Sequence, residues 1–321
     1  MNVSNALDII ASKFPGRIMS GDIDLSGYMS DAYTPKVKAV DYYRDDLIKR
    51  LRQKEQIGDK SGFAIDMNFR FRPCEITIWS GYKGHGKSIL LSQVLLRMLK
   101  DGKKIFICSP EFHPVELLYR NLVQLVGSID PSEEEAHVAL DWLTDKLWLY
   151  DVQASLKPRD VPALCRWVAE NIKPDHIVID SLMKCGIAPD DYSSQKILVD
   201  KLQTVAHQNP LHIHLVAHAK KGQNDDNPPR LHDIKGASEI GDLAENVLTV
   251  WRNKNKEKER SYGEASKHAM EPDAVLTVEA QRNAGGWIGQ IILNYNRDSM
   301  TFYENGRDWR DYVSIRNEVV L

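Results

Sequence analysis

Cysteine, long apolar runs and net charge are all scarce in this sequence, and each scarcity excludes a class of protein. The chain has 321 residues and only 4 cysteines, which lie far apart and form no Cys-x-x-Cys pair: Cys74, Cys108, Cys165 and Cys185. We therefore expect reduced thiols, with neither a disulfide framework nor a cysteine zinc site.

No stretch approaches the roughly 20 apolar residues of a membrane span, and the N-terminus has no apolar core behind a basic start. The formal net charge is −3, so any binding to nucleic acid must come from a local basic patch. Apolar residues make up 42% and charged residues 27%, the balance of a globular protein. We expect a soluble, intracellular protein without membrane contact, from the cytoplasm of a bacterium or phage-infected cell or from the mitochondrial matrix.

Three parts can be separated along the chain. Residues 1–36 show little periodicity and are expected to form an extended lead-in. Residues 37–61 are expected to hold a linker helix, entered at Pro35 and running from Val37 to Gln53, and then a polar linker from Glu55 to Gly62. The helix carries one apolar stripe, formed by Val40, Tyr43, Leu47 and Leu51. Residues 62–321 are expected to form one large domain.

Strands and helices alternate in this large domain, which predicts an α/β fold with a mostly parallel sheet flanked by helices. Short apolar runs predict six strands: Glu75–Trp79, Lys104–Cys108, Leu147–Tyr150, His176–Ile179, Ile213–Ala217 and Asn246–Trp251. Three more strands, joined by turns, predict an antiparallel C-terminal extension: Val275–Ala280, Gly289–Asn294 and Met300–Tyr303. The charged, aperiodic stretch Asn253–Met270 is expected to be a surface loop.

The strongest chemical signal fits the pattern G-x-x-x-x-G-K-[ST] of a phosphate-binding P-loop. Its residues are Gly81, Tyr82, Lys83, Gly84, His85, Gly86, Lys87 and Ser88, between a predicted strand and the helix Ser88–Lys100. Glycines let the backbone turn its N–H groups toward phosphate oxygens, and the following helix adds its positive end. We expect Lys87 to reach the β- and γ-phosphates of a nucleoside triphosphate and Ser88 to place its hydroxyl on Mg²⁺.

Two carboxylates follow predicted strands at positions suited to ATP chemistry. Asp180 ends the run His176–Ile179, where a P-loop ATPase holds Mg²⁺, although many strands end in Asp for turn reasons alone. Glu111 follows the strand after the P-loop helix, where a general base could polarise the attacking water. The alternative for Glu111 is a solvated loop carboxylate.

The order of strand, P-loop, helix, strand and Ser-x-Glu resembles the DnaB-type replicative hexameric helicases, and within them the Twinkle and phage helicase-primase group. The resemblance runs from about Gly62 to Tyr303. It implies a RecA-like core that binds ATP or another NTP with Mg²⁺, self-association into a hexameric ring, and single-stranded DNA as partner, with primase or polymerase as further partners. No primase or zinc-binding domain is recognisable in the chain.

The resemblance also assigns roles to single residues. His218 would contact the γ-phosphate, Arg282 would act as an arginine finger on the neighbouring subunit, and Arg252 and Tyr295 would bind the nucleotide. The DNA-binding residues would be Lys220, Lys221, Lys235, Gly236 and Ala237. Without the resemblance, His218 could be a structural histidine at a strand end, the lysine loop a solvated turn, and Tyr295 an ordinary sheet aromatic. His212 and His214 are interpreted as structural, because a metal site would need further ligands.

One position departs from the family pattern: Ala280 stands where these helicases place a lysine two residues before the finger arginine. This puts the coupling between subunits in doubt. We therefore expect a ring-forming DNA helicase and keep two alternatives open. One is a RecA- or KaiC-like ATPase used in recombination or signalling, and the other is a weakly hydrolysing, nucleotide-gated DNA-binding or loader protein.

Overall fold

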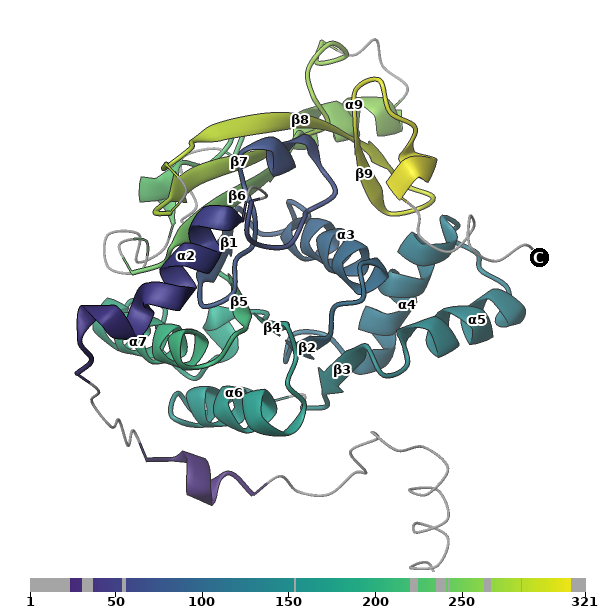
Figure 1. The fold of residues 1–321 in the computed structure, drawn as a ribbon. Coiled ribbons are helices and arrows are strands. Elements are labelled where there is room, and N and C mark those ends of the chain that lie inside the picture. The colour runs from purple at the N-terminus through teal and green to yellow at the C-terminus, as the bar shows by residue number, and fades with distance from the viewer. Residues whose placement is uncertain are drawn as a thin grey trace, which may run out of the picture.

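The computed structural model describes residues 24–30, 37–53, 56–152, 154–219, 225–234, 241, 243–262, 267–283 and 285–312. A nine-stranded sheet forms its centre, with the strand order β3-β2-β4-β5-β1-β6-β7-β8-β9 (Figure 1). The strands are β1 Ile76–Ser80, β2 Ile105–Cys108, β3 Leu147–Tyr150, β4 His176–Ile179, β5 His212–Val216, β6 Asn246–Arg252, β7 Ala274–Gln281, β8 Gly289–Asn296 and β9 Thr301–Glu304. Strands β1 to β6 pair in parallel, and β7, β8 and β9 extend the sheet antiparallel.

The α-helices are α2 Arg44–Arg52, α3 Lys87–Lys100, α4 Pro114–Val126, α5 Glu133–Leu143, α6 Asp160–Asn171, α7 Tyr192–Gln208 and α9 Lys254–Tyr262. The short 3₁₀ helices are η1 Ser26–Tyr28, η2 Val40–Tyr43, η3 Ala64–Met67, η4 Leu182–Lys184, η5 Leu231–Asp233 and η6 Trp309–Tyr312. No helix in the described ranges is long and apolar enough to cross a membrane.

Two apolar cores lie on the two faces of the sheet, because side chains alternate along each strand. On β1, Trp79 joins the core formed with α3, α4 and α5, whereas Ile78 joins the core formed with α6 and α7. Figure 1 shows these two helix groups on opposite sides of the sheet. The expected fold class is confirmed: a mostly parallel sheet, flanked by helices and extended by C-terminal antiparallel strands.

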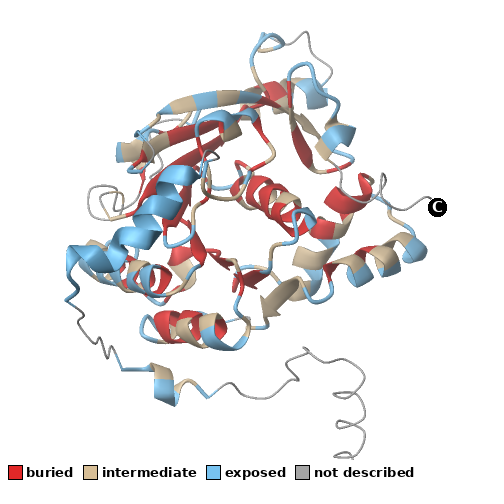
Figure 2. Ribbon diagram, viewed as in Figure 1, coloured by how far each residue is buried: buried red, intermediate tan, exposed pale blue. Residues whose placement is uncertain are grey.

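The segment expected as one helix from Val37 to Gln53 forms η2 and then the nine-residue helix α2. Its apolar stripe is exposed along the whole segment, with Val40 at 90%, Leu47 at 58% and Leu51 at 70% exposure. Figure 2 shows α2 in the colour of exposed residues throughout. The helix therefore does not bury its apolar face on its own domain.

Segments on either side of the expected linker helix contact the large domain. Upstream, the main-chain oxygen of Tyr28 accepts a hydrogen bond from Arg166 Nη2 of α6 at 2.6 Å. Downstream, Asp59 forms a β-bridge with Phe71 and receives an ion pair from Lys103 at 2.9 Å. The polar stretch from Glu55 to Gly62 is thus already part of the folded domain from Asp59 onward.

The prediction of a surface loop over Asn253–Met270 is wrong in its first half, which forms α9. The helix is polar on all sides, so no apolar periodicity marks it in the sequence. Charge pairs hold it instead: Lys256 is buried and pairs with Asp273 at 3.0 Å, and Lys254 pairs with Glu257 at 2.9 Å. Asp273 directly precedes β7, so one of these partners lies outside the helix.

A buried polar network joins β1, β4 and β5 within the sheet. Trp79 Nε1 donates to His214 Nδ1 at 3.1 Å, His214 Nε2 lies 3.1 Å from His176 Nδ1, and His176 Nε2 lies 3.1 Å from Asp59 Oδ2. These contacts form one directed chain if both histidines are neutral and carry their proton on Nε2. No cluster of three or more His, Cys, Asp or Glu side chains suited to a metal ion occurs among the described residues.

Candidate active site

The parallel strands bring four of the five predicted catalytic residues to one edge of the sheet, namely Lys87, Glu111, Asp180 and His218. β1 ends at Ser80 and leads into the P-loop, β2 leads to Glu111, β4 to Asp180 and β5 to His218. Because β2, β4, β5 and β1 are consecutive neighbours in the sheet, their carboxyl ends form one continuous row. Ligand sites of open α/β sheets lie at this edge.

The P-loop adopts the backbone that its glycines allow. Gly81, Gly84 and Gly86 have positive φ angles of 148°, 79° and 84°. A Cβ atom on Gly81 would lie only 2.2 Å from the carbonyl oxygen of Val250, so this position also needs glycine for close approach to β6. The loop then runs directly into α3, whose first residue is Lys87.

Lys87 is buried inside this loop, where its Nζ donates to the main-chain oxygens of Gly81 and Tyr82, each at 2.9 Å. Burial lowers the pKa of Lys87 to about 8, and the carboxylates of Asp180 and Glu111 act in the opposite direction. No carboxylate within the described residues forms an ion pair with it. An anionic ligand in the loop would supply the missing counter-charge.

Asp180 is the opposite case: a buried carboxyl group whose negative charge lacks solvation. It is buried at the end of β4, and it lines one small pocket together with Ser88. Burial raises the pKa of Asp180, because the charged form lacks solvation, and the Ser88 contact opposes this. A hydroxyl and a carboxylate are the hard oxygen donors that Mg²⁺ prefers. With only these two protein donors, a metal ion would take its other ligands from phosphate and water.

Two polar side chains approach one carboxylate oxygen of Glu111. Ser181 Oγ donates to Glu111 Oε1 at 2.6 Å, and His218 Nε2 lies 3.7 Å from the same oxygen. The contact with His218 and the hydrogen bond from Ser181 lower the pKa of Glu111 to about 2, although burial acts in the opposite direction. Glu111 is therefore fully ionised and a weak base in this arrangement.

An aromatic and cationic patch borders the P-loop on its other side. The Arg252 guanidinium carbon lies 4.1 Å from the centre of the Tyr295 ring, and Tyr295 contacts Phe302 at 4.8 Å between ring centres. A Cβ atom on Gly86 would come within 3.1 Å of Phe302 and within 3.0 Å of Arg252. These side chains therefore pack directly on the P-loop, where a flat nucleotide base could stack.

Comparison with known proteins agrees with this geometry. The family described as an AAA domain matches residues 70–224. A solved DnaB-like replicative helicase, studied for its interactions with primase, superposes with a TM-score of 0.65 at 14% identity, covering 84% of this chain and 67% of that one. A second solved structure, of an ATPase domain alone, gives a TM-score of 0.70 at 14% identity and covers 84% of this chain and 99% of its own. The fold is that of a DnaB-like ATPase domain.

The sequence itself has a distant organellar relative. The chain is 24% identical over 269 residues to the Twinkle homolog protein, chloroplastic/mitochondrial, of Arabidopsis thaliana. That match covers 75% of this chain and 35% of the relative, so the chain spans about a third of the relative's length. The resemblance to DnaB-type helicases, with a distant likeness to Twinkle, is thus confirmed.

Arg282 is not brought to the P-loop edge of the sheet. It follows β7, and its main-chain N–H donates to the oxygen of Glu245 at 2.7 Å, at the amino end of β6. The P-loop lies beside the other end of β6, a seven-residue strand that spans roughly 20 Å. That separation exceeds the length of an arginine side chain, so Arg282 does not serve the nucleotide site of its own chain.

The five predicted DNA-binding residues, Lys220, Lys221, Lys235, Gly236 and Ala237, lie outside the described residues. Of the remaining P-loop residues, Lys83 and Gly84 are exposed, whereas Tyr82 and His85 are buried. Tyr82 packs with Ala219 and Trp251 in a small apolar cluster beside the loop.

Two contacts at this site could not be predicted from the sequence. His85 Nδ1 accepts from the Arg252 main-chain N–H at 3.2 Å, and its Nε2 lies 3.2 Å from Asp225 Oδ2, so a neutral His85 ties the P-loop to the segment that follows residue 224. Ser181 and Glu111 meet across 70 residues of sequence. Neither pair has a signal in local spacing, because both depend on which strands become neighbours.

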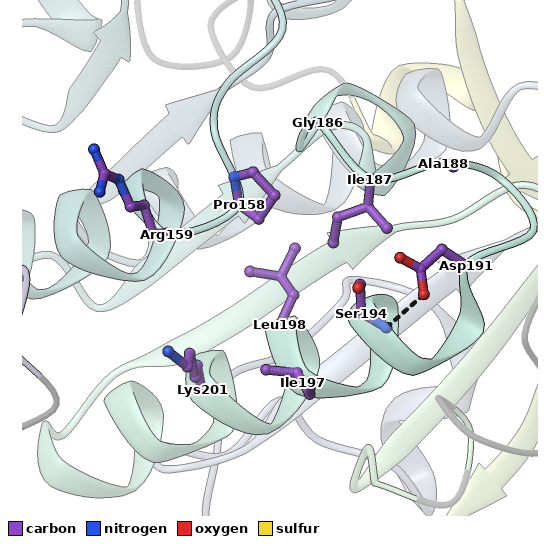
Figure 3. A pocket seen from close by; sticks show the side chains of 10 residues that line it. All are labelled: Pro158, Arg159, Gly186, Ile187, Ala188, Asp191, Ser194, Ile197, Leu198 and Lys201. Carbon is purple, nitrogen blue, oxygen red and sulfur yellow. Dashed lines mark hydrogen bonds between the residues drawn. The ribbon is translucent and has the colours of Figure 1, made fainter.

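A separate pocket of about 270 Å³ lies between the start of α6 and the start of α7 (Figure 3). Ile187 and Leu198 point into it, and Arg159 and Lys201 lie at its rim. None of the predicted nucleotide-site residues lines it, so it is distinct from the P-loop site.

Proposed function

We propose that this chain is the ATPase motor of a ring-forming DNA helicase, which couples ATP hydrolysis to translocation on single-stranded DNA and to duplex unwinding. The observation that carries the proposal is the cluster of Lys87, Asp180, Glu111 and His218 at one sheet edge of a DnaB-like ATPase fold. The fold supports NTP hydrolysis as the general activity, and the helicase activity is the finer proposal.

The nucleotide would complete the charges that this edge leaves uncompensated. Its β- and γ-phosphates would neutralise Lys87, and Mg²⁺ held by Ser88 and Asp180 would neutralise the buried carboxylate. Arg252 and Tyr295 would hold the base. Glu111 would accept the proton of the attacking water, and His218 would contact the γ-phosphate.

Assembly into a ring would supply the residue that each site lacks. Arg282 lies at the opposite end of its own sheet, so it can act as a finger only on a neighbouring subunit. The exposed stripe of α2 offers a way to hold that neighbour, because an isolated helix of this length is marginal in water and gains stability by burying its apolar face. We propose that α2 packs on the adjacent subunit and that the ring is a hexamer.

DNA would run through the ring against loops that carry Lys220, Lys221 and Lys235, with primase or polymerase as further partners. Contacts of lysines to phosphates give affinity without sequence preference, which suits a motor that moves along DNA. A RecA- or KaiC-like ATPase would use the same catalytic edge without unwinding, and a loader would bind ATP but hydrolyse it slowly.

Hydrolysis with and without single-stranded DNA, measured on the same preparation as fork unwinding, separates these functions. We expect DNA to stimulate hydrolysis and unwinding to depend on it, and Glu111→Gln to bind ATP without turnover. Stimulated hydrolysis without unwinding would favour the RecA- or KaiC-like function. Tight ATP binding with negligible hydrolysis in the wild type would favour the loader.

A further inference from the structure

The hydrogen bond between Ser181 and Glu111 joins a buried, fixed residue to a partly exposed one. Ser181 is completely buried, and its main-chain oxygen accepts from the N–H of Lys184 at 2.9 Å, which fixes it in the turn after β4. Glu111 stands in the loop between β2 and α4, and about a quarter of its side chain is exposed. If the contact breaks, Glu111 moves and Ser181 stays.

The bond also acts on the carboxyl group that a general base would use, through one of its two oxygens. Ser181 Oγ donates to Oε1, and His218 Nε2 lies 3.7 Å from the same oxygen. A carboxylate that accepts such bonds has its charge stabilised and takes up a proton less readily. While this bond is in place, Glu111 is a weaker base and its carboxyl group is held in one orientation.

We propose that Ser181 is a positioning residue that holds Glu111 in a resting orientation, and that release of this hydrogen bond precedes hydrolysis. The inference rests on the proposed role of Glu111 as base and assigns to Ser181 a regulatory contact with it. Ser181 itself touches neither nucleotide nor water in this scheme. Its effect is to keep turnover low until the site is fully assembled.

The test compares Ser181→Ala, which removes the donor, with Ser181→Thr, which keeps it. We expect Ser181→Ala to raise the DNA-free kcat for ATP about tenfold, the effect of losing one modest hydrogen bond to a charged group, while KM for ATP stays unchanged. Ser181→Thr should restore the low wild-type rate. Ser181→Cys, with its weak S–H donor, should lie between the two and serves if the threonine methyl prevents folding.

The Glu111→Gln background separates this inference from the proposed function. In that background, adding Ser181→Ala should leave kcat for ATP unchanged, because no general base remains at residue 111. If Glu111→Gln alone hydrolyses ATP normally, the proposed base is wrong. If Glu111→Gln is inactive but Ser181→Ala lowers kcat or leaves it unchanged, Glu111 is the base. The proposal that Ser181 keeps Glu111 in a resting orientation is then refuted.

Discussion

Acidification should destabilise this protein before most carboxylates titrate, because two histidines are buried without charge. His212 and His214 lie in β5, and their ring centres are 4.6 Å apart. Burial, and then the neighbouring His176, lower the pKa of His212 to about 3. Burial and the neighbouring histidines also hold the pKa of His214 well below its usual range.

The direction of the change in the free energy of unfolding follows from proton uptake on unfolding. In the unfolded chain both histidines regain the ordinary pKa of about 6.5, so below that pH the unfolded state binds more protons than the folded state. Their contribution is therefore complete above about pH 7 and is lost as the pH falls from about 6.5 toward 3. Between pH 7 and pH 5 the two together remove about 4 kcal/mol from the free energy of unfolding.

Other groups with shifted pKa values also contribute to this pH dependence, in both directions. Burial also lowers the pKa of His85, which adds to the loss, whereas Glu271 raises the pKa of the partly exposed His268, which opposes it. Most carboxyl groups titrate below about pH 5 and stay ionised in both states over this window. A loss of about 4 kcal/mol is a large fraction of the stability of a typical domain.

Urea unfolding between pH 5 and pH 7.5 measures the effect, with His214→Gln as the matched variant. Glutamine can accept from Trp79 through its oxygen and donate to His176 through its amide, so the network keeps its polarity without a titrating group. We expect the pH dependence of this variant to be about half that of the wild type. A wild-type free energy of unfolding that is flat from pH 7 to pH 5 would refute the neutral, buried state of these histidines.

Further predictions concern the nucleotide, the subunit boundary, DNA and assembly. Lys87→Ala should abolish ATP binding, measured with a fluorescent nucleotide, because the buried phosphates lose their main counter-charge. Arg282→Ala should lower ATP turnover by roughly 10³-fold or more with little change in affinity, and mixing it with Lys87→Ala subunits should restore part of the activity; no rescue in mixed rings would argue against a shared site. Alanine at Lys220, Lys221 and Lys235 together should weaken single-strand binding and its salt dependence but spare DNA-free hydrolysis. Deleting residues 1–54 should give folded, ATP-binding monomers by mass in solution, whereas rings that persist would show that α2 is not needed.

Much of the fold could be predicted because its information is local. Each parallel strand is a short apolar run, so β3 and β4 begin and end where the sequence predicts. The P-loop could also be located, since its glycine spacing itself creates the backbone that surrounds a phosphate. Glu111 and Asp180 could be singled out because each follows a predicted strand, whereas His218 was assigned only by the resemblance to DnaB-type helicases.

What could not be predicted depends on contacts across the sheet. α9 is stabilised by ion pairs with Asp273 of the region leading into β7, which no window of sequence around α9 contains. The chain from Trp79 through His214 to Asp59 joins three strands, and periodicity marked only the apolar neighbours of these residues. The hold of Ser181 on Glu111 arises because β4 is the neighbour of β2, which sequence order does not reveal.

The central claim is that ATP hydrolysis at this sheet edge drives strand separation. Its most direct test is ATP-dependent displacement of a labelled strand from a forked DNA, with the wild type and Glu111→Gln side by side. We predict that the wild type displaces the strand and that Glu111→Gln binds ATP and DNA but displaces none. Displacement by Glu111→Gln at the wild-type rate, or none by a wild type that hydrolyses ATP on DNA, would contradict the account.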